Sequence, residues 1–194
     1  MIRLDYEIIA DIIEPGSKVL DLGCGDGELL SLLKQKKDCR GTGIEISPEE
    51  IFKCMERGVS VAQGSIDSDF DVYEDKRFDY VILNESLQQV LNIEKVLSES
   101  LRIGKKVIVG IPNFCDVRAR FQLFFMGKVP VTESLPYKWY NTPNLRFLSL
   151  KDFRDFCFEK GINIEKACYL SEGRKVLWCT NLFADSGIFV LKRG

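Results

Sequence analysis

The alternation of apolar and polar positions along this chain predicts helices and strands in turn. Residues 3–14 place apolar side chains at helical spacing, and Pro15 and Gly16 end that helix. Strand-like apolar runs lie at residues 18–23, 41–46, 59–63, 78–84 and 105–112. Helical periods lie between them, at residues 27–36, 47–57 and 92–103.

Start and stop signals support these boundaries. Ser47 is placed as an N-cap, with Pro48 at the first helical position and Glu50 three residues after the cap. Gly58 and Gly104 follow the last periodic residues of two helices. Strands that alternate with helices in this way predict a doubly wound, mostly parallel α/β sheet with ligands at the carboxyl ends of its strands.

The regular alternation stops after Pro112. An apolar helix is predicted at residues 114–128, and a loop rich in proline and aromatic residues follows at 129–144. We treat residues 113–147 as an insertion, because the segment is too long for a simple connection. A capped helix at 149–161 and two closing strands, which could form a hairpin, complete a seven-stranded sheet; the closing strands are residues 162–170 and 187–193.

Composition narrows the class of protein. The 194 residues, 45% of them hydrophobic, suffice for one core, so we expect a single domain over residues 1–194. A net charge of −2 gives no general attraction to nucleic acid or to anionic membranes. Seven scattered cysteines without a C-x-x-C pair, and the lack of histidine, argue against a metal site and suit reduced thiols in the cytoplasm. No apolar run is long enough to span a membrane.

The stretch LDLGCGDG, residues 20–27, is the main candidate for ligand binding. Gly23, Gly25 and Gly27 follow the first predicted strand, and Glu45 ends the second, twenty residues after Gly25. A carboxylate at that position can accept hydrogen bonds from the hydroxyls of a ribose, as in dinucleotide folds. The spacing G-x-G-x-G differs from the NAD fingerprint, and the simplest alternative is a tight turn with no ligand.

Charge favours one kind of nucleoside. Two like charges ~4 Å apart near a protein surface repel by about 4 kcal/mol, so Asp21 and Asp26 would each oppose a pyrophosphate. The same carboxylates favour a ligand with an ammonium and a sulfonium group, as in S-adenosylmethionine.

These residues resemble class I S-adenosylmethionine-dependent methyltransferases, whose first motif is similar to VLDLGCGDGELL and whose ribose-binding strand is similar to GIEIS. The family often has Gly-Asp near the third strand, whereas this chain has Gly64-Ser65 with Asp67 two residues on, so either Ser65 or Asp67 could contact the adenine. The thiol of Cys24 could instead pack within the loop. The resemblance implies a cofactor site, for S-adenosylmethionine or S-adenosylhomocysteine, formed by Asp21, Gly23, Cys24, Gly25, Glu45, Ile46, Ser65, Ile66 and Asn84.

A second resemblance covers nearly the whole chain. The segments PNFCDVRARFQ (112–122) and LPYKWYNTPN (135–144) are similar to the methionine biosynthesis protein MetW family, although Leu145-Arg146-Phe147 stand where that family commonly has a histidine. This resemblance implies a role in methionine biosynthesis together with a homoserine O-acyltransferase. We expect the insertion to contact a partner or to cover the cofactor, unless its aromatic residues simply pack on the sheet; the candidates are Tyr137, Trp139, Tyr140 and Asn141.

Three functions follow as hypotheses. The chain could bind S-adenosylmethionine and engage the acyltransferase, could methylate a small molecule, or could be an NAD-dependent enzyme, which the two loop aspartates oppose. No residue is assigned as catalytic. With no histidine present, Glu85 after the fourth strand is the best-placed carboxylate for a base, although a plain surface acid is the simpler interpretation.

Overall fold

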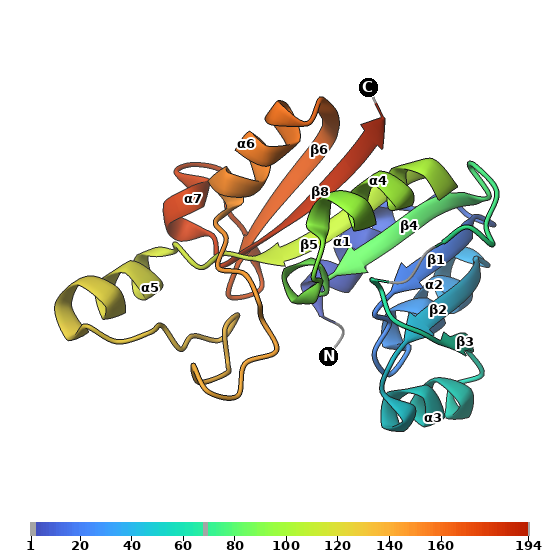
Figure 1. Ribbon diagram of the computed structural model, residues 1–194, viewed down its shortest axis with the longest axis horizontal. Helices are drawn as coiled ribbons and strands as arrows, with labels where there is room; N and C mark the ends of the chain where they lie inside the picture. The colour runs from blue at the N-terminus through green and yellow to red at the C-terminus, as the bar shows by residue number, and fades with distance from the viewer. Residues whose placement is uncertain (1–2, 68–69, 194) are drawn as a thin grey trace.

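A computed structural model describes residues 3–67 and 70–193, and its centre is one twisted sheet of eight strands (Figure 1). The strands are β1 Lys18–Leu22, β2 Arg40–Glu45, β3 Ser60–Gln63, β4 Phe78–Asn84, β5 Gly104–Pro112, β6 Ile162–Ser171, β7 Arg174–Lys175 and β8 Ser186–Arg193. They lie side by side in the order β3-β2-β1-β4-β5-β8-β6-β7. The first five strands are mutually parallel, and β8 runs antiparallel between β5 and β6.

The predicted fold class is confirmed, with one correction to the number of strands. Two residues, Arg174 and Lys175, form β7, which pairs with the end of β6 and makes an eighth strand. Glu172 and Gly173 turn the chain there with φ of +48° and +70°. A pair so short has no apolar period of its own, so the hydrophobic pattern could not predict it.

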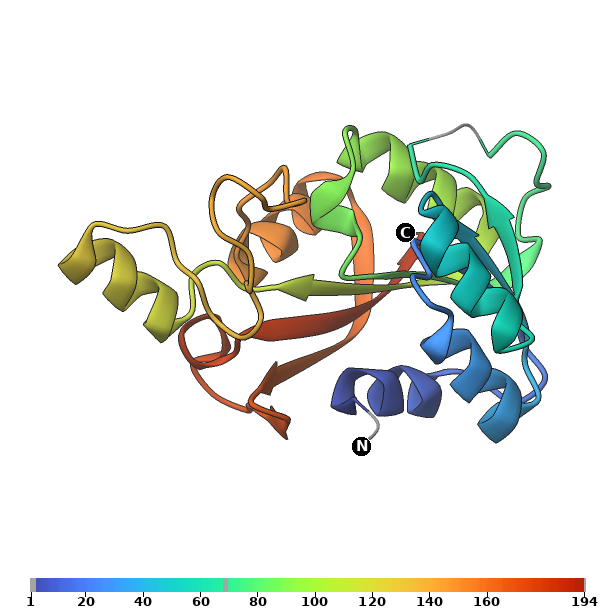
Figure 2. The same cartoon turned by 90° about the horizontal axis from the view of Figure 1, so that it is seen from below.

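Helices cover both faces of the sheet (Figure 2). They are α1 Leu4–Ile12, α2 Glu28–Lys37, α3 Pro48–Glu56, α4 Ile93–Ile103, α5 Val117–Phe121, α6 Leu150–Glu159 and α7 Thr180–Phe183, with a 3-10 turn η1 Leu87–Gln89 and a π-helical turn η2 Gln122–Met126. The helices α1, α2 and α3 share one buried cluster with Val19 and Ile82. The helices α4 and α6 share the other with Leu20 and Leu83. Because neighbouring residues of β1 and β4 face opposite sides, these strands are buried on both faces, as predicted.

The segment between β5 and α6 departs from its predicted form. One helix was expected at residues 114–128, but α5 has five residues and the chain then widens into η2, which Gly127 ends with φ of +59°. This part projects from the body of the molecule (Figures 1 and 2). Its apolar side chains are exposed, with Phe124 83% and Phe125 69% accessible. Apolar residues here therefore do not mark a core helix.

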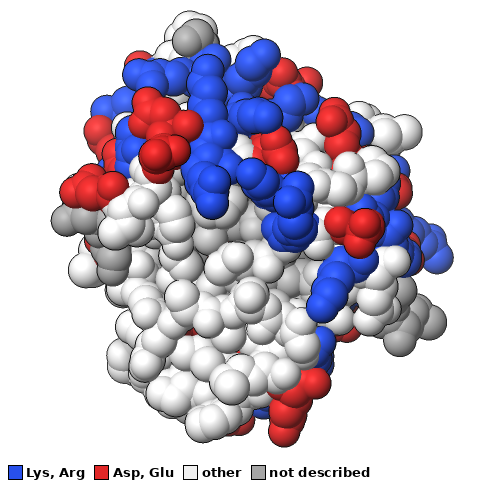
Figure 3. All heavy atoms as spheres, turned by 90° about the vertical axis from the view of Figure 1, so that its right-hand side faces the viewer, with Lys and Arg blue, Asp and Glu red and all other residues white. Residues whose placement is uncertain are grey.

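Charged side chains are distributed unevenly over the surface. Lysine and arginine gather over the upper part of the face in Figure 3. Lysine and arginine stand at the start of parallel strands, where Lys18 of β1 lies beside Arg40 of β2 in the sheet. They also stand at the end of β8, at Lys192 and Arg193. The candidate site lies at the opposite, carboxyl ends of the parallel strands.

Candidate functional site

The glycine loop, residues 23–27, connects β1 to α2 at the carboxyl end of the sheet. The backbone N–H groups of Gly23 and Cys24 donate to the carbonyl of Ile44 at 2.8 and 3.2 Å, which ties the loop to β2. Gly25 has φ of +54°, and no atom of the described residues lies within 4 Å of a Cβ built on it. Glycine suits this backbone, and the open space allows a ligand to approach it closely.

Glu45 ends β2 and holds the glycine loop through its carboxylate. Its Oε2 accepts from the N–H of Gly25 at 2.9 Å, and its Oε1 accepts from the N–H groups of Ile46 and Ser47 at 2.8 and 2.9 Å. A carboxylate offers about four acceptor positions, so one on Oε2 is still open. The geometry thus fits one ribose hydroxyl directly, and a second would have to replace a backbone donor. Ile46, also predicted to contact the cofactor, is 66% exposed beside this carboxylate.

Asp21 lies on β1, two residues before Gly23, and is only 3% exposed. No hydrogen-bond donor for its carboxylate is found among the described residues. Burial, and secondarily the negative charge of Glu45, raise the pKa of Asp21 to about 7. A buried carboxyl without a donor would be stabilised in its ionised form by a positively charged ligand nearby.

The thiol of Cys24 points into the protein. Its Sγ lies 3.9 Å from that of Cys54 on α3, and a Cβ on Gly43 would collide with it. Burial, followed by the charge of Asp21, raises the pKa of Cys24. Cys24 can therefore meet a ligand through its backbone alone, in keeping with the packing alternative for its side chain.

The residues after β3 lie beside the glycine loop, and some of them form hydrogen bonds that hold neighbouring loops. A Cβ on Gly23 would lie 3.0 Å from Cδ1 of Ile66, so Ile66 lies against the glycine loop. The Oγ of Ser65 accepts from the N–H of Asp67 at 3.2 Å. The carboxylate of Asp67 accepts from the N–H groups of Leu91 and Asn92 at 2.9 and 3.2 Å. Asp67 therefore holds the start of α4, while the Ser65 hydroxyl still has a proton to donate.

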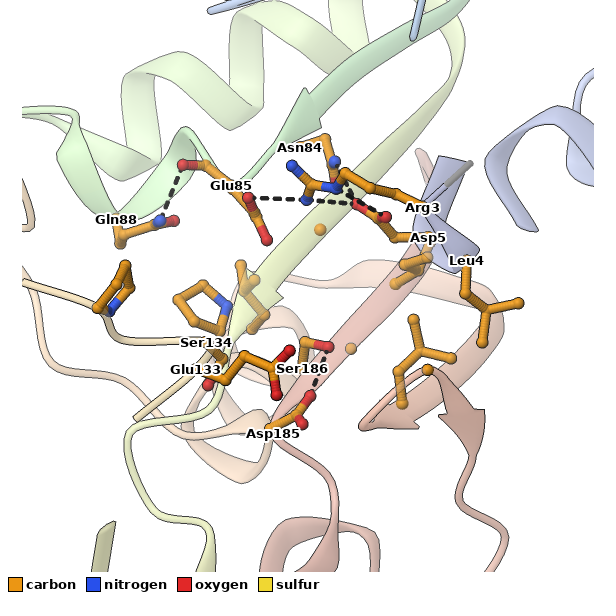
Figure 4. Close-up of a pocket in the computed structure, with 18 of the residues that line it drawn as sticks. Arg3, Leu4, Asp5, Asn84, Glu85, Gln88, Glu133, Ser134, Asp185 and Ser186 are labelled. Atoms are coloured by element: carbon orange, nitrogen blue, oxygen red, sulfur yellow. Dashed lines mark hydrogen bonds and ion pairs between the residues drawn. The ribbon is translucent and has the colours of Figure 1, made fainter. Parts of the chain in front are cut away.

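Asn84 ends β4 and is bound by the start of α1. Its Nδ2 donates to Asp5 at 2.9 Å, and Arg3 pairs with Asp5 at 2.8 Å and with Glu85 at 2.9 Å, as Figure 4 shows. Gly110 of β5 makes room for Asn84, since a Cβ there would collide with Oδ1. We call Arg3, Asp5, Asn84 and Glu85 the N-terminal clasp.

Glu85, considered from the sequence as a base, is occupied by this clasp. It has φ of +58°, a backbone conformation that costs on the order of 1–3 kcal/mol for a residue other than glycine and that is found mainly at functional sites. Because Arg3 is its ion-pair partner, its carboxylate holds the start of α1, which is the role of a structural acid. The sequence pattern gave no signal for the clasp, because Asp5 and Asn84 are 79 residues apart.

The three candidate aromatic residues of the insertion are largely exposed. Tyr137, Trp139 and Tyr140 are 47%, 72% and 64% exposed, and Trp139 stands edge-on to Tyr140 with ring centres 5.7 Å apart. Asn141 accepts from the N–H of Lys138 at 2.9 Å and shapes the turn. Tyr137 lines a cavity together with Asn84, which brings the insertion to the edge of the predicted cofactor site.

Within residues 3–67 and 70–193, no three His, Cys, Asp or Glu side chains gather closely enough to hold a metal ion. No helix in this part of the chain combines the length and the apolar character that a bilayer crossing requires.

Comparison with known sequences identifies a family. The family described as methionine biosynthesis protein MetW matches residues 3–191. The bifunctional methionine biosynthesis protein MetXA/MetW of Rhodopirellula baltica is 32% identical over 205 residues, covering 99% of this chain. This chain spans only a third, 33%, of that relative's length. Norajmaline N-methyltransferase of Rauvolfia serpentina is 34% identical over 107 residues, which cover 49% of this chain and 36% of the relative.

Solved structures share the fold at low sequence identity. A putative methyltransferase in complex with the Trm112 activator of Haloferax volcanii superposes with a TM-score of 0.71 at 16% identity, covering 98% of this chain and 89% of that one. A SAM-dependent methyltransferase of Thermotoga maritima, described as a possible histamine N-methyltransferase, gives 0.68 at 21% identity, covering 98% and 88%. These similarities establish the methyltransferase fold and leave the ligand open.

Proposed function

Because the chain belongs to the methionine biosynthesis protein MetW family, we propose that it binds S-adenosylmethionine or S-adenosylhomocysteine at the glycine loop and acts in methionine biosynthesis. The observation that carries this proposal is the junction of Gly25 and Glu45. There an open, glycine-lined backbone meets a carboxylate with one free acceptor position. A phosphate-free nucleoside suits this junction, since a diphosphate would face both Glu45 and Asp21.

The predicted contacts take the following roles in this proposal. The backbone of Gly23, Cys24 and Gly25 meets the methionine part, and the buried carboxyl of Asp21 provides the negative charge behind it. Glu45 and Ile46 meet the ribose and Ser65 and Ile66 the adenine. Asn84 faces the methyl group after the hydrogen bond from its Nδ2 to Asp5 has broken.

Calorimetry with S-adenosylmethionine and S-adenosylhomocysteine tests the cofactor proposal. Glu45→Gln should weaken binding by roughly 1–3 kcal/mol, the scale of a hydrogen bond to a charged group. The control is Glu49→Gln, which removes the same charge from an 80% exposed side chain in the first turn of α3. Absence of binding by the unchanged protein, or tighter binding of NAD than of either ligand, would contradict the proposal.

We also propose that residues 113–147 form the contact with a homoserine O-acyltransferase. Two features support this: the exposed aromatic residues of the segment, which are of the kind enriched at interface hot spots, and the joining of MetXA and MetW in the name of one relative. Co-purification of the two proteins, with and without S-adenosylmethionine, tests the contact. Failure to associate under both conditions would contradict the proposed contact.

The single-domain organisation of residues 1–194 stays a prediction.

A small-molecule methyltransferase is the second candidate function. The observation that favours it is the cavity beside Asn84, at the carboxyl ends of β4 and β5, where an acceptor could reach a methyl donor held by the glycine loop. Labelled S-adenosylmethionine incubated with the protein and a cell extract should then yield a labelled metabolite. A blank result with binding-competent protein counts against catalysis.

A further inference from the structure

The cavity beside Asn84 has its own chemical character, separate from the glycine loop. It has a volume of about 540 Å³ and opens between the start of α1, the ends of β4 and β5, the insertion and the start of β8 (Figure 4). A space of this size holds a small organic molecule. Apart from Asn84, none of the predicted cofactor residues lines it.

Negative charge dominates the lining. One guanidinium, that of Arg3, stands against five carboxylates, which belong to Asp5, Glu85, Glu133, Glu172 and Asp185. Arg3 is shared between Asp5 and Glu85, and Arg118 from outside the cavity pairs with Glu172 and Asp185 at 2.7 and 3.1 Å. Glu133 has no ion pair among the described residues. The lining thus retains uncompensated negative charge.

A second, independent observation points to a missing hydrogen-bond donor. Gln88 lines the cavity and is only 4% exposed. Its Nε2 donates to the carbonyl of Glu85 at 2.8 Å, while its Oε1 has no partner among the described residues. Because Nε2 is committed as a donor to a carbonyl, exchanging the two ends of the amide would only bring two acceptors together. A buried acceptor without a donor is uncommon in a folded protein.

We propose that this cavity binds a small organic cation with N–H donors, either a primary ammonium or a guanidinium. Glu85 and Gln88, which follow β4, and Glu133 of the insertion line the same space, as Figure 4 shows. An N–H group would satisfy Oε1 of Gln88, and its positive charge would offset the carboxylates. A neutral ligand would supply the donor without the charge, and an anion would supply neither. A metal ion is not favoured, because no three His, Cys, Asp or Glu side chains of the described residues gather closely enough to hold one.

Three five-carbon probes separate these possibilities in calorimetry without cofactor: 1,5-diaminopentane, the neutral 1,5-pentanediol and the anionic glutarate. The dication should bind at least about tenfold more tightly than either of the others. Glu133→Gln should weaken its binding about three- to tenfold, and Gln88→Met should weaken it further. The matched control is Glu159→Gln, an exposed carboxylate on α6 outside the cavity, which should change binding less than twofold.

Three outcomes would overturn the proposal. The first is equal or absent binding of the three probes. The second is equal weakening by Glu133→Gln and Glu159→Gln, which would mean general attraction to an acidic surface. The third is full competition between the dication and S-adenosylmethionine, which would assign the carboxylates to the cofactor. Glu133 is exposed and has no hydrogen bond or ion pair among the described residues, so its variant keeps the test valid even where Gln88→Met is unstable. Since cofactor binding is measured separately, a failure here is distinct from a failure of the proposed function.

Discussion

Asp21 and Glu45 are two carboxylates with different tasks at the same site. Glu45 is held by three backbone N–H groups and organises the glycine loop, whereas Asp21 is buried with no donor among the residues that the structure describes. The pKa of Asp21 is raised to about 7 by burial and by Glu45, against an ordinary value of about 4. Between about pH 4 and pH 7 the folded protein therefore holds a proton that the unfolded chain has released.

Asp21 should make the protein less stable as the pH rises. Its favourable contribution is complete below about pH 4 and is lost as the pH approaches 7, with a total on the order of 4 kcal/mol. Asp21→Asn should flatten the fall in the free energy of unfolding between about pH 5 and pH 7, as measured by urea denaturation. Asp26→Asn, at a loop carboxylate paired with Arg57 at 2.9 Å, should leave the slope unchanged. An unchanged slope in Asp21→Asn would contradict the assignment.

The same ionisation should couple to cofactor affinity. A cationic ligand favours the ionised form of Asp21. As the pH rises toward about 7, binding of S-adenosylmethionine should therefore strengthen by up to about tenfold per pH unit, and above about pH 7 it should level off. Calorimetry across this range measures it. In Asp21→Asn the dependence should disappear, and a dependence that persists there would locate the proton elsewhere.

Gly23 combines a backbone and a packing requirement. It has φ of +80°, and a Cβ would lie 3.0 Å from Ile66 and from Ser86. Gly16 has a similar φ of +74° with open space around it. Gly16→Ala should therefore cost about 1 kcal/mol in the free energy of unfolding through its backbone alone, and Gly23→Ala about 1–3 kcal/mol more. Equal losses for the two variants in thermal or urea unfolding would mean that Ile66 and Ser86 move aside freely.

At the residue scale, the sequence predicts relative position only where local spacing determines it. Gly25 and Glu45 are separated by twenty residues in the sequence. They lie next to each other because both stand at the carboxyl ends of neighbouring parallel strands, β1 and β2. The direction of the Cys24 thiol could not be predicted, since it depends on Cys54 of α3. Gln88 and the N-terminal clasp depend likewise on tertiary contacts between distant segments.

At the scale of elements, cap chemistry proved a better guide than apolar content. The helix α6 begins at the Ser149 cap predicted from the sequence, and Ser149 and Asp152 form a reciprocal capping box. The 114–128 segment has the apolar content of a buried helix, yet it forms the short α5 and the exposed η2. Apolar composition predicts burial only when a neighbouring surface is available to cover it.

The capping box of α6 gives a direct stability prediction. Ser149 is 3% exposed, and its Oγ accepts from the N–H of Asp152 at 3.1 Å while donating to that carboxylate at 2.7 Å. Ser149→Ala should lower the free energy of unfolding by about 1–2 kcal/mol. Ser98→Ala, at an exposed position within α4, should change it by less than about 0.5 kcal/mol. Similar values for both in urea denaturation would show that the box is dispensable.

At the scale of the whole molecule, three surfaces have distinct characters: a basic edge at the amino ends of the parallel strands, an acidic cavity at their carboxyl ends, and a projecting apolar insertion. The mostly parallel, doubly wound sheet was predicted from the alternation of patterns along the chain, whereas the order of its strands was not. The projection of the insertion could not be predicted, because it depends on which surfaces of the folded molecule lie next to the insertion.

The exposed insertion should affect association without affecting folding. Trp139 is 72% exposed, so Trp139→Ala should leave thermal unfolding nearly unchanged and weaken binding to a homoserine O-acyltransferase by about 1 kcal/mol or more. The matched control is Trp178→Ala, a 69% exposed tryptophan that packs on Phe183 outside the insertion. Equal effects of the two changes on binding would place the interface elsewhere.

The N-terminal clasp has a practical consequence for anyone preparing this protein. Arg3 lines the acidic cavity and holds Glu85, so the cavity borders the first residues that the structure describes. A polyhistidine sequence fused close to Arg3 would add positive charge beside the carboxylates of this cavity. Ligand screens should therefore use material tagged at the other terminus, where β8 ends at the distant basic edge.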